Sequence, residues 1–144
     1  MDIVIDFDGT CVAHEFPQVG RNIGAQPVLI DLIRAGHRLI LSTMRSDVSE
    51  AQSELPEIHC KPGMYLTEAL EWFKVQGIDL YGIQVNPTQD RFTTSPKCYG
   101  HLYIDDAALG IPLVYPLKGK PYVYWKKVRL LLEERGLLNI TEKC

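Results

Sequence analysis

Ile3-Val4-Ile5-Asp6-Phe7-Asp8-Gly9-Thr10 is the stretch of this 144-residue chain that decides the fold. Its Val and Ile residues favour a buried strand. Gly9 permits a sharp backbone turn, so Asp6 and Asp8 are expected where the strand becomes a loop. In an open α/β sheet, ligands bind at that edge.

Further apolar runs predict more strands, and two of them also end in polar groups. Residues 38–41 are followed by Ser42 and Thr43, and residues 101–104 are followed by Asp105 and Asp106. Residues 80–85 predict another strand, with the long loop 86–97 after it. Residues 111–115 predict a short edge strand, because Pro112 lacks the N–H donor that a central strand needs.

Helical patterns lie between these strands. Pro27 is expected to open a helix that stops at Gly36, and residues 47–55 predict a short helix broken by Pro56. Pro62 is expected to begin a longer helix, and residues 124–135 predict a terminal one. The alternation predicts one α/β domain over residues 1–144, with a mostly parallel sheet and helices on both faces. The tail 139–144 is expected to fray.

Composition narrows the classes of function. The net charge of -3 and the pI of about 5.8 give no overall basic footprint for nucleic acid. The four cysteines form no C-x-x-C pair, which argues against a zinc ribbon or a thioredoxin-like site. The four histidines, His14 among them, lack zinc-protease spacing and are expected at the surface or in packing. No apolar stretch has the length of a membrane span, so we expect a soluble, cytoplasmic protein without a membrane partner.

The polar strand ends predict a metal site. In a parallel sheet, the groups after residues 5, 41 and 104 converge on one edge. Carboxylates held together raise each other's pKa unless a cation neutralises them. An all-oxygen acidic site suits Mg²⁺, which pairs with phosphate oxygens. Bound Mg²⁺ is therefore the expected cofactor.

The order of four motifs resembles the haloacid dehalogenase-like (HAD) superfamily, whose members are chiefly phosphatases. The motifs are Asp6-Phe7-Asp8-Gly9-Thr10, Leu41-Ser42-Thr43, Lys97, and Tyr103-Ile104-Asp105-Asp106. They span nearly the whole chain. The resemblance implies a Rossmann-like three-layer sandwich and a phosphomonoester hydrolase that works through an aspartyl-phosphate.

The resemblance also implies roles for individual residues. Asp6 is the nucleophile, and Asp8 is the general acid and then the general base. Mg²⁺ is held by Asp6, by Asp105 and by the backbone carbonyl of Asp8. Phosphate is bound by the Thr43 hydroxyl, the Met44 N–H and the Lys97 ammonium. The supporting residues are Gly9, Thr10, Arg45 and Asp106.

Several alternatives stay open on sequence alone. Lys61 also precedes a predicted helix and competes with Lys97 as the phosphate-binding lysine. Ser42 and Thr43 could simply cap the following turn, and Arg45 and Arg21 are candidate substrate contacts. An EF-hand fails, because a third ligand before the glycine and a later Glu are missing. A receiver-like phosphoacceptor domain fits poorly with the Gly-Thr after Asp8, and a catalytically idle phosphate- or partner-binding domain is the main rival.

The size of the connections bears on the substrate. No segment is long enough for the cap domain that sets substrate choice in the family, so the chain is expected to be capless. An open site suits a macromolecular phosphate end, or a small ester enclosed by a homo-oligomer. A local basic patch with tyrosines keeps nucleic acid as a minor alternative, and its lysines are Lys118, Lys120, Lys126 and Lys127.

Overall fold

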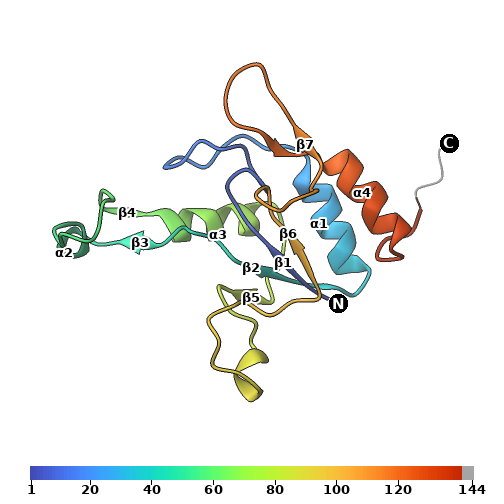
Figure 1. Ribbon diagram of the computed structural model, residues 1–144, viewed down its shortest axis with the longest axis horizontal. Coiled ribbons are helices and arrows are strands. Elements are labelled where there is room, and N and C mark those ends of the chain that lie inside the picture. Colours follow the sequence, from blue (N-terminus) through green and yellow to red (C-terminus); the bar gives the residue numbers. More distant parts are fainter. Residues whose placement is uncertain (141–144) are drawn as a thin grey trace.

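The structure is a computed structural model that describes residues 1–140. Its central sheet has four parallel strands in the order β5-β2-β1-β6 (Figure 1). These are β1 (Asp2–Ile5), β2 (Arg38–Leu41), β5 (Gly82–Ile83) and β6 (Leu102–Ile104). The predicted α/β, Rossmann-like fold with a parallel sheet is confirmed.

Helices α1 (Ala25–Arg34), α3 (Tyr65–Val75) and α4 (Trp125–Glu134) pack against one face of this sheet. The crossovers from β1 to β2 and from β2 to β5 step in the same direction. Right-handed connections therefore put α1 and α3 on the same side. Ile3 and Ile5 point into this main core, where residues of all three helices are buried.

The opposite face is covered by the long connection between β5 and β6. This connection steps back across the sheet, so the same handedness rule sends it over the other face. Val4 and Ile40 meet Cys98 and Tyr81 there. The connection carries only the short 3-10 helix η1 (Gln89–Arg91), so the helices expected on both faces are represented here by this single turn.

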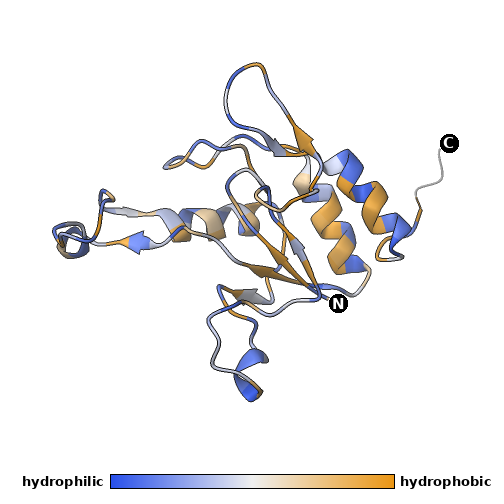
Figure 2. Cartoon of the chain, in the orientation of Figure 1, coloured by the Kyte–Doolittle hydropathy of each residue, from blue (hydrophilic) through white to orange (hydrophobic). Residues whose placement is uncertain are grey.

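Residues 47–64, called the arm below, differ from the prediction. The expected helix over 47–55 is only α2 (Glu50–Ser53), and Pro62 does not open a helix, because α3 begins at Tyr65. Instead β3 (Asp47–Val48) pairs antiparallel with β4 (Gly63–Met64). The arm projects from the sheet with a mainly hydrophilic tip at α2 (Figures 1 and 2).

The physical reason for this difference is tertiary. The Asp47 carboxylate accepts hydrogen bonds from the Thr67 N–H (3.0 Å) and the Thr67 hydroxyl (2.6 Å) at the start of α3. This contact ties the base of the arm to that helix and holds Asp47 in the extended ladder. Since α2 buries no residue, it does not cover the sheet as expected.

The predicted edge strand over 111–115 lies outside the central sheet. Residues Leu113–Val114 form β7, which pairs antiparallel with β8 (Tyr122–Val123) in a separate hairpin. The tip of this hairpin, residues 115–121, stands out beside α4 in Figure 1. Prediction missed β8, because a strand of two residues carries almost no periodic signal.

Two further points concern single features of the chain. None of the helices within residues 1–140 has the length and apolarity needed to cross a bilayer. Cys11, Cys60 and Cys98 are free thiols. Residues 141–144 of the tail that was expected to fray, Cys144 among them, lie outside the described residues.

Asp2 anchors the far end of the sheet and gives a first testable prediction. Its buried carboxylate accepts hydrogen bonds from Arg38 Nε (2.8 Å) and from Asn86 Nδ2 (2.9 Å). Burial alone would raise the pKa of Asp2, but these hydrogen bonds and the Arg38 charge lower it below 3.8. Its stabilising contribution is therefore present above pH 3.8 and is lost as the pH falls through the depressed pKa.

We therefore expect Asp2→Asn to lower the free energy of unfolding at pH 7 by about 1–3 kcal/mol. The difference in the free energy of unfolding between this variant and the wild type should become smaller at pH 3. Urea denaturation at both values measures it, with Asp79→Asn, an exposed aspartate, as the control. An equal gap at pH 7 and pH 3 would contradict this explanation.

Candidate active site

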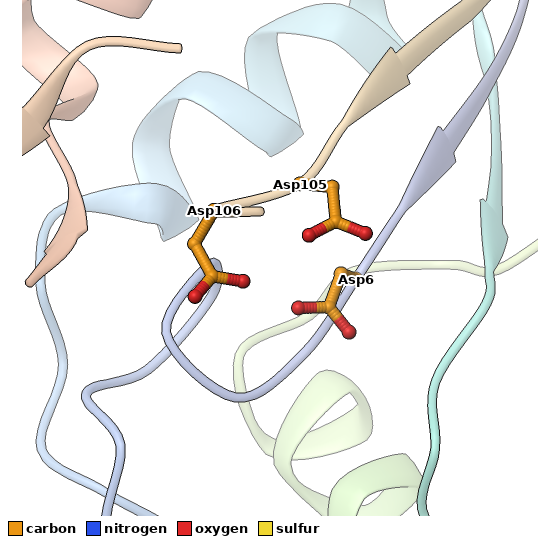
Figure 3. Close-up of side chains that lie close together, drawn as sticks. All are labelled: Asp6, Asp105 and Asp106. Atoms are coloured by element: carbon orange, nitrogen blue, oxygen red, sulfur yellow. The ribbon is translucent and has the colours of Figure 1, made fainter. Parts of the chain in front are cut away.

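Three carboxylates meet at the carboxyl edge of the sheet. Asp6 directly follows β1, and Asp105 and Asp106 follow β6, whose Ile104 is in register with Ile5. One oxygen of each carboxylate lies within 4.8 Å of the others, and Figure 3 shows the side chains converging. The predicted convergence of Asp6 and Asp105 is confirmed.

The electrostatics of the cluster are unfavourable without a cation. Burial raises the pKa of the Asp6 carboxyl to about 7, and the negative charge of Asp105 acts in the same direction. Burial alone would also raise the pKa of Asp106, but hydrogen bonds, chiefly from His14, lower it. A divalent cation would relieve this repulsion.

The turn after Phe7 is built to bring the cluster together. Gly9 has a φ of +81°, and an added Cβ would collide with His14 Nε2 and lie 2.7 Å from Asp106 Oδ2. The buried Thr10 hydroxyl donates to Asp6 Oδ2 (3.0 Å) and accepts from the Asp106 N–H (3.0 Å). Gly9 and Thr10 thus support the carboxylates, which is the role expected for them from the sequence.

His14 belongs to the site and was not predicted. Its Nε2 lies 2.7 Å from Asp106 Oδ2 and fixes that carboxylate on the side away from Asp6. Sequence reasoning assigned His14 to the surface or to packing. The only available signal was its place in a short loop directly after the acidic motif.

A pocket of about 170 Å³ opens beside the cluster. It is lined by residues of three strand ends and of the long connection: Val4, Asp6, Ser42, Lys97, Cys98, Tyr103, Ile104 and Asp105. Strand alternation explains this set of residues. Val4, Ile40 and Tyr103 lie on the face of the sheet opposite the main core. Asp6, Ser42 and Asp105 each come two residues later, directly after the same strands, so they lie on that same face. Ser42 and Lys97 therefore line the same small cavity as Asp6 and Asp105.

Lys97 is the lysine that the structure brings to this pocket. The Lys97 carbonyl accepts a 2.6 Å hydrogen bond from Nε2 of the buried Gln89, and its ammonium lies 5.7 Å from the Tyr103 ring. Lys61 lies on the arm, where its carbonyl accepts a hydrogen bond from the Tyr65 hydroxyl, and it lines none of the described pockets with Asp6. Gln89 is a second supporting residue that sequence reasoning missed.

The predicted phosphate-binding turn is shaped by Gln84. The Thr43 N–H donates to Gln84 Oε1 (2.9 Å), and Gln84 Nε2 donates to the Thr43 carbonyl (2.9 Å). Gln84 itself has a φ of +66°, which is rare for a residue with a side chain. Ser42, and not Thr43, lines the pocket, while the Thr43 hydroxyl accepts from the Arg45 N–H (3.1 Å).

Met44 completes that turn. Its side chain is almost fully exposed, and its N–H has no hydrogen-bond partner among residues 1–140. A free N–H at the end of β2 is a donor that an anion could use. The Met44 N–H and the Thr43 hydroxyl thus stay available beside the pocket, as alternatives or additions to Ser42.

Asp8 lies apart from the acidic cluster. Its two oxygens accept hydrogen bonds from Nε and Nη2 of Arg45, each at 2.8 Å. The guanidinium is buried and also donates to the carbonyls of Gln18 (2.9 Å) and Tyr65 (3.2 Å). Arg45 is therefore committed to Asp8 and to the backbone, which argues against direct substrate contact in this arrangement.

The donor set fits Mg²⁺ better than a softer metal. All side-chain oxygens of the cluster come from carboxylates, and within residues 1–140 neither sulfur nor ring nitrogen joins them in the group of possible ligands. Hard oxygen donors favour Mg²⁺ or Ca²⁺, and Mg²⁺ needs few protein ligands because it keeps several waters. Asp6 and Asp105 would hold the ion, and Asp106 would support them.

Comparison with known proteins bears on the fold of the chain. No protein-family model matches the chain, and no match was found among curated proteins. A solved structure of a conserved protein coded by a locus from Bacteroides thetaiotaomicron is similar, with 29% sequence identity and a TM-score of 0.68. The similarity covers 94% of this chain and 91% of that chain. It supports the Rossmann-like α/β architecture over nearly the whole length.

Proposed function

We propose that this protein is a Mg²⁺-dependent phosphomonoester hydrolase of the HAD type that works through Asp6. The single observation that carries the proposal is the pocket that Asp6, Ser42, Lys97 and Asp105 line together. A nucleophile, a hydroxyl donor, an ammonium and a metal-binding carboxylate surround a space suited to a phosphoryl group. Simple helix capping or a solvated turn would not require the lysine of a distant loop at the same place.

The proposed reaction has two displacements. One Asp6 oxygen forms a bond to phosphorus, and the bond from phosphorus to the ester oxygen breaks while that oxygen takes a proton from Asp8. Water then attacks phosphorus and gives its proton to Asp8, and the bond from phosphorus to Asp6 breaks. The products are an alcohol and inorganic phosphate, and Asp8 regains the proton it gave.

The residues around the pocket would offset the negative charge of the phosphoryl group. Mg²⁺ bound by Asp6 and Asp105 would reduce the repulsion between the nucleophile and the phosphate dianion. Lys97 would offset charge on the phosphoryl oxygens, and Ser42, Thr43 and the Met44 N–H would donate hydrogen bonds to them. Arg45 would fix the position of Asp8, the proposed proton donor.

Removal of Asp105 tests the metal site directly. We expect Mg²⁺ to raise the thermal midpoint of the wild type, because a ligand at 100 times its Kd stabilises the folded state by about 2.7 kcal/mol. Asp105→Asn should abolish that shift and reduce turnover of an aryl phosphate to background. Differential scanning fluorimetry with and without Mg²⁺, beside a phosphate-release assay, measures both quantities.

Asp90→Asn serves as the matched control, since Asp90 is exposed on η1 and lies outside the acidic cluster. This variant should keep the full Mg²⁺ shift. If Asp105→Asn kept the shift as well, the ion would bind elsewhere and the proposal would fail. Absence of Mg²⁺-dependent turnover of any phosphate ester by the wild type would equally count against hydrolysis.

A second candidate is a catalytically idle phosphate- or partner-binding domain. The paired hydrogen bonds between Arg45 and Asp8 favour it, because they occupy both oxygens of the expected proton donor. This function predicts Mg²⁺-dependent binding of inorganic phosphate or vanadate in calorimetry without release of phosphate from esters. Rapid turnover of an aryl phosphate would exclude it.

A further inference from the structure

One stretch of the chain has a charge that the proposed chemistry does not use. Between Asp106 and Glu133 there is no acidic residue, although the whole chain carries a net charge of -3. The stretch contains one arginine and four lysines, which are Lys118, Lys120, Lys126 and Lys127. Its lysines run from the β7–β8 hairpin into the first turn of α4.

These lysines are exposed and available. Among residues 1–140, none of the four forms an ion pair with an acidic side chain. Arg129, by contrast, is paired with Asp31 at 2.6 Å. The lysine charges are therefore free to meet an anion from outside the chain.

Helix α4 carries its charges against its own dipole. Lys126 and Lys127 lie in its first turn and Glu134 in its last, and no acidic residue occupies the first turn. Cations at a helix N-terminus oppose the macrodipole, so this pattern does not serve helix stability. It concentrates positive potential at the end of α4 that adjoins the hairpin.

Aromatic rings lie between the lysines. Tyr115 is 75% exposed at the hairpin tip, and the Tyr124 ring lies 5.6 Å from the Lys127 ammonium. Tyr122 and Tyr124 line a cleft of about 490 Å³ together with Lys126 and Arg21. We call these tyrosines (Tyr115, Tyr122 and Tyr124) and the four lysines the basic face.

The basic face is joined to the candidate active site. The Val123 N–H donates to the Gly9 carbonyl (2.9 Å), and Trp125 Nε1 donates to the Thr10 carbonyl (2.7 Å). Gly9 and Thr10 form the turn that supports Asp6 and Asp106. These two hydrogen bonds join the backbone beneath the basic face to the turn that supports the cluster.

We propose that the basic face binds single-stranded nucleic acid. Lysines would contact successive phosphates, and the tyrosines would stack on bases, which is how sequence-tolerant single-strand binding works. An acidic peptide would use the lysines but has no bases to stack on the tyrosines. We further infer that the substrate is a terminal phosphate of such a strand. This second part rests on the proposed phosphatase function.

Binding can be measured apart from chemistry. The probe is a fluorescein-labelled, 5′-phosphorylated oligothymidylate of about 12 nucleotides, within the usual site sizes. The protein is the full chain carrying Asp6→Asn, so that no turnover interferes. Adding Lys118→Glu and Lys120→Glu should weaken binding at least about tenfold, and should reduce the slope of log K against log salt by about 1.4.

Matched variants separate charge from stacking. Lys74→Glu, at an exposed lysine on α3, should leave binding unchanged. Tyr115→Ala should weaken oligothymidylate binding several-fold but leave binding of inorganic polyphosphate unchanged, because polyphosphate has no bases. In the otherwise wild-type chain, Lys118→Glu with Lys120→Glu should raise KM for phosphate release from the oligonucleotide without changing aryl phosphate turnover.

Three results would overturn the inference: no saturable oligothymidylate binding at low salt, binding undiminished by the two charge reversals, or binding of anionic lipid vesicles without oligothymidylate binding. Binding that follows the variants as expected, together with no phosphate release from either the oligonucleotide or an aryl phosphate, would support the basic face and reject the phosphatase function. Aryl phosphate turnover without oligothymidylate binding would support the phosphatase function and reject nucleic-acid binding by the basic face.

Discussion

Asp6→Asn is expected to abolish phosphate-ester turnover, with a loss of about 10⁴-fold or more, as is typical when a nucleophile is removed. The amide keeps the shape of the carboxylate but cannot form the covalent bond to phosphorus. A phosphate-release assay with an aryl phosphate and saturating Mg²⁺ measures the effect. Full activity in this variant would refute a mechanism through Asp6.

The same variant should be more stable than the wild type when metal is absent. Because burial raises the pKa of Asp6 to about 7, the folded metal-free protein loses stability as the pH rises from 3.8 to about 7. Asn at this position removes that cost, which is on the order of 2–4 kcal/mol at pH 8. Urea denaturation in EDTA should show a large difference in the free energy of unfolding between Asp6→Asn and the wild type at pH 8, and little difference at pH 4.

These two results separate a catalytic role from a structural one. A residue that only supported the fold would lose activity and stability together when replaced. Thr10→Val gives the comparison, because it removes the hydroxyl that donates to Asp6 while leaving the nucleophile in place. It should lower stability and reduce turnover only in part.

Arg45→Lys has the second largest expected effect. Lysine cannot reproduce two parallel hydrogen bonds to Asp8 together with donation to the carbonyls of Gln18 and Tyr65. Breaking this buried network should lower the free energy of unfolding by about 3 kcal/mol. A displaced Asp8 should also lower kcat by about 10²-fold, as an error of 1 Å in placement can.

The Mg²⁺-induced rise in thermal midpoint should survive in Arg45→Lys, because Arg45 contacts none of the three clustered carboxylates. Arg34→Lys, at an arginine 78% exposed on α1, is the control and should change neither stability nor turnover. A double-mutant cycle with Asp8→Asn should give a coupling energy of about 1–3 kcal/mol. Additive effects would mean that the two side chains act independently.

Much of the site was predictable because its main residues follow apolar runs. Asp6, Ser42 and Asp105 each come directly after a strand, and parallel pairing brings strand ends together whatever the connections do. The position of Lys97 followed from the order of motifs in a family resemblance. Physical patterning of its own loop gave no signal for it.

The arm and the hairpin were not predictable in the same way. Strands β3, β4, β7 and β8 have two residues each, too few for periodicity to register. Their pairing depends on contacts such as the one from Asp47 to Thr67, which join residues 20 positions apart. Propensity in residues 47–55 favoured a helix, and this tertiary contact overrode it at Asp47.

The amino-acid sequence by itself determined the parallel sheet and the edge at which acidic groups collect, because buried strands and the residues after them are local features. Only the tertiary structure decided what each group does there. It paired Asp8 with Arg45, placed His14 against Asp106 and brought Ser42 and Lys97 into one pocket with Asp6. The reason is physical: hydrogen bonds and charge pairing act through space, between side chains that the sequence keeps far apart.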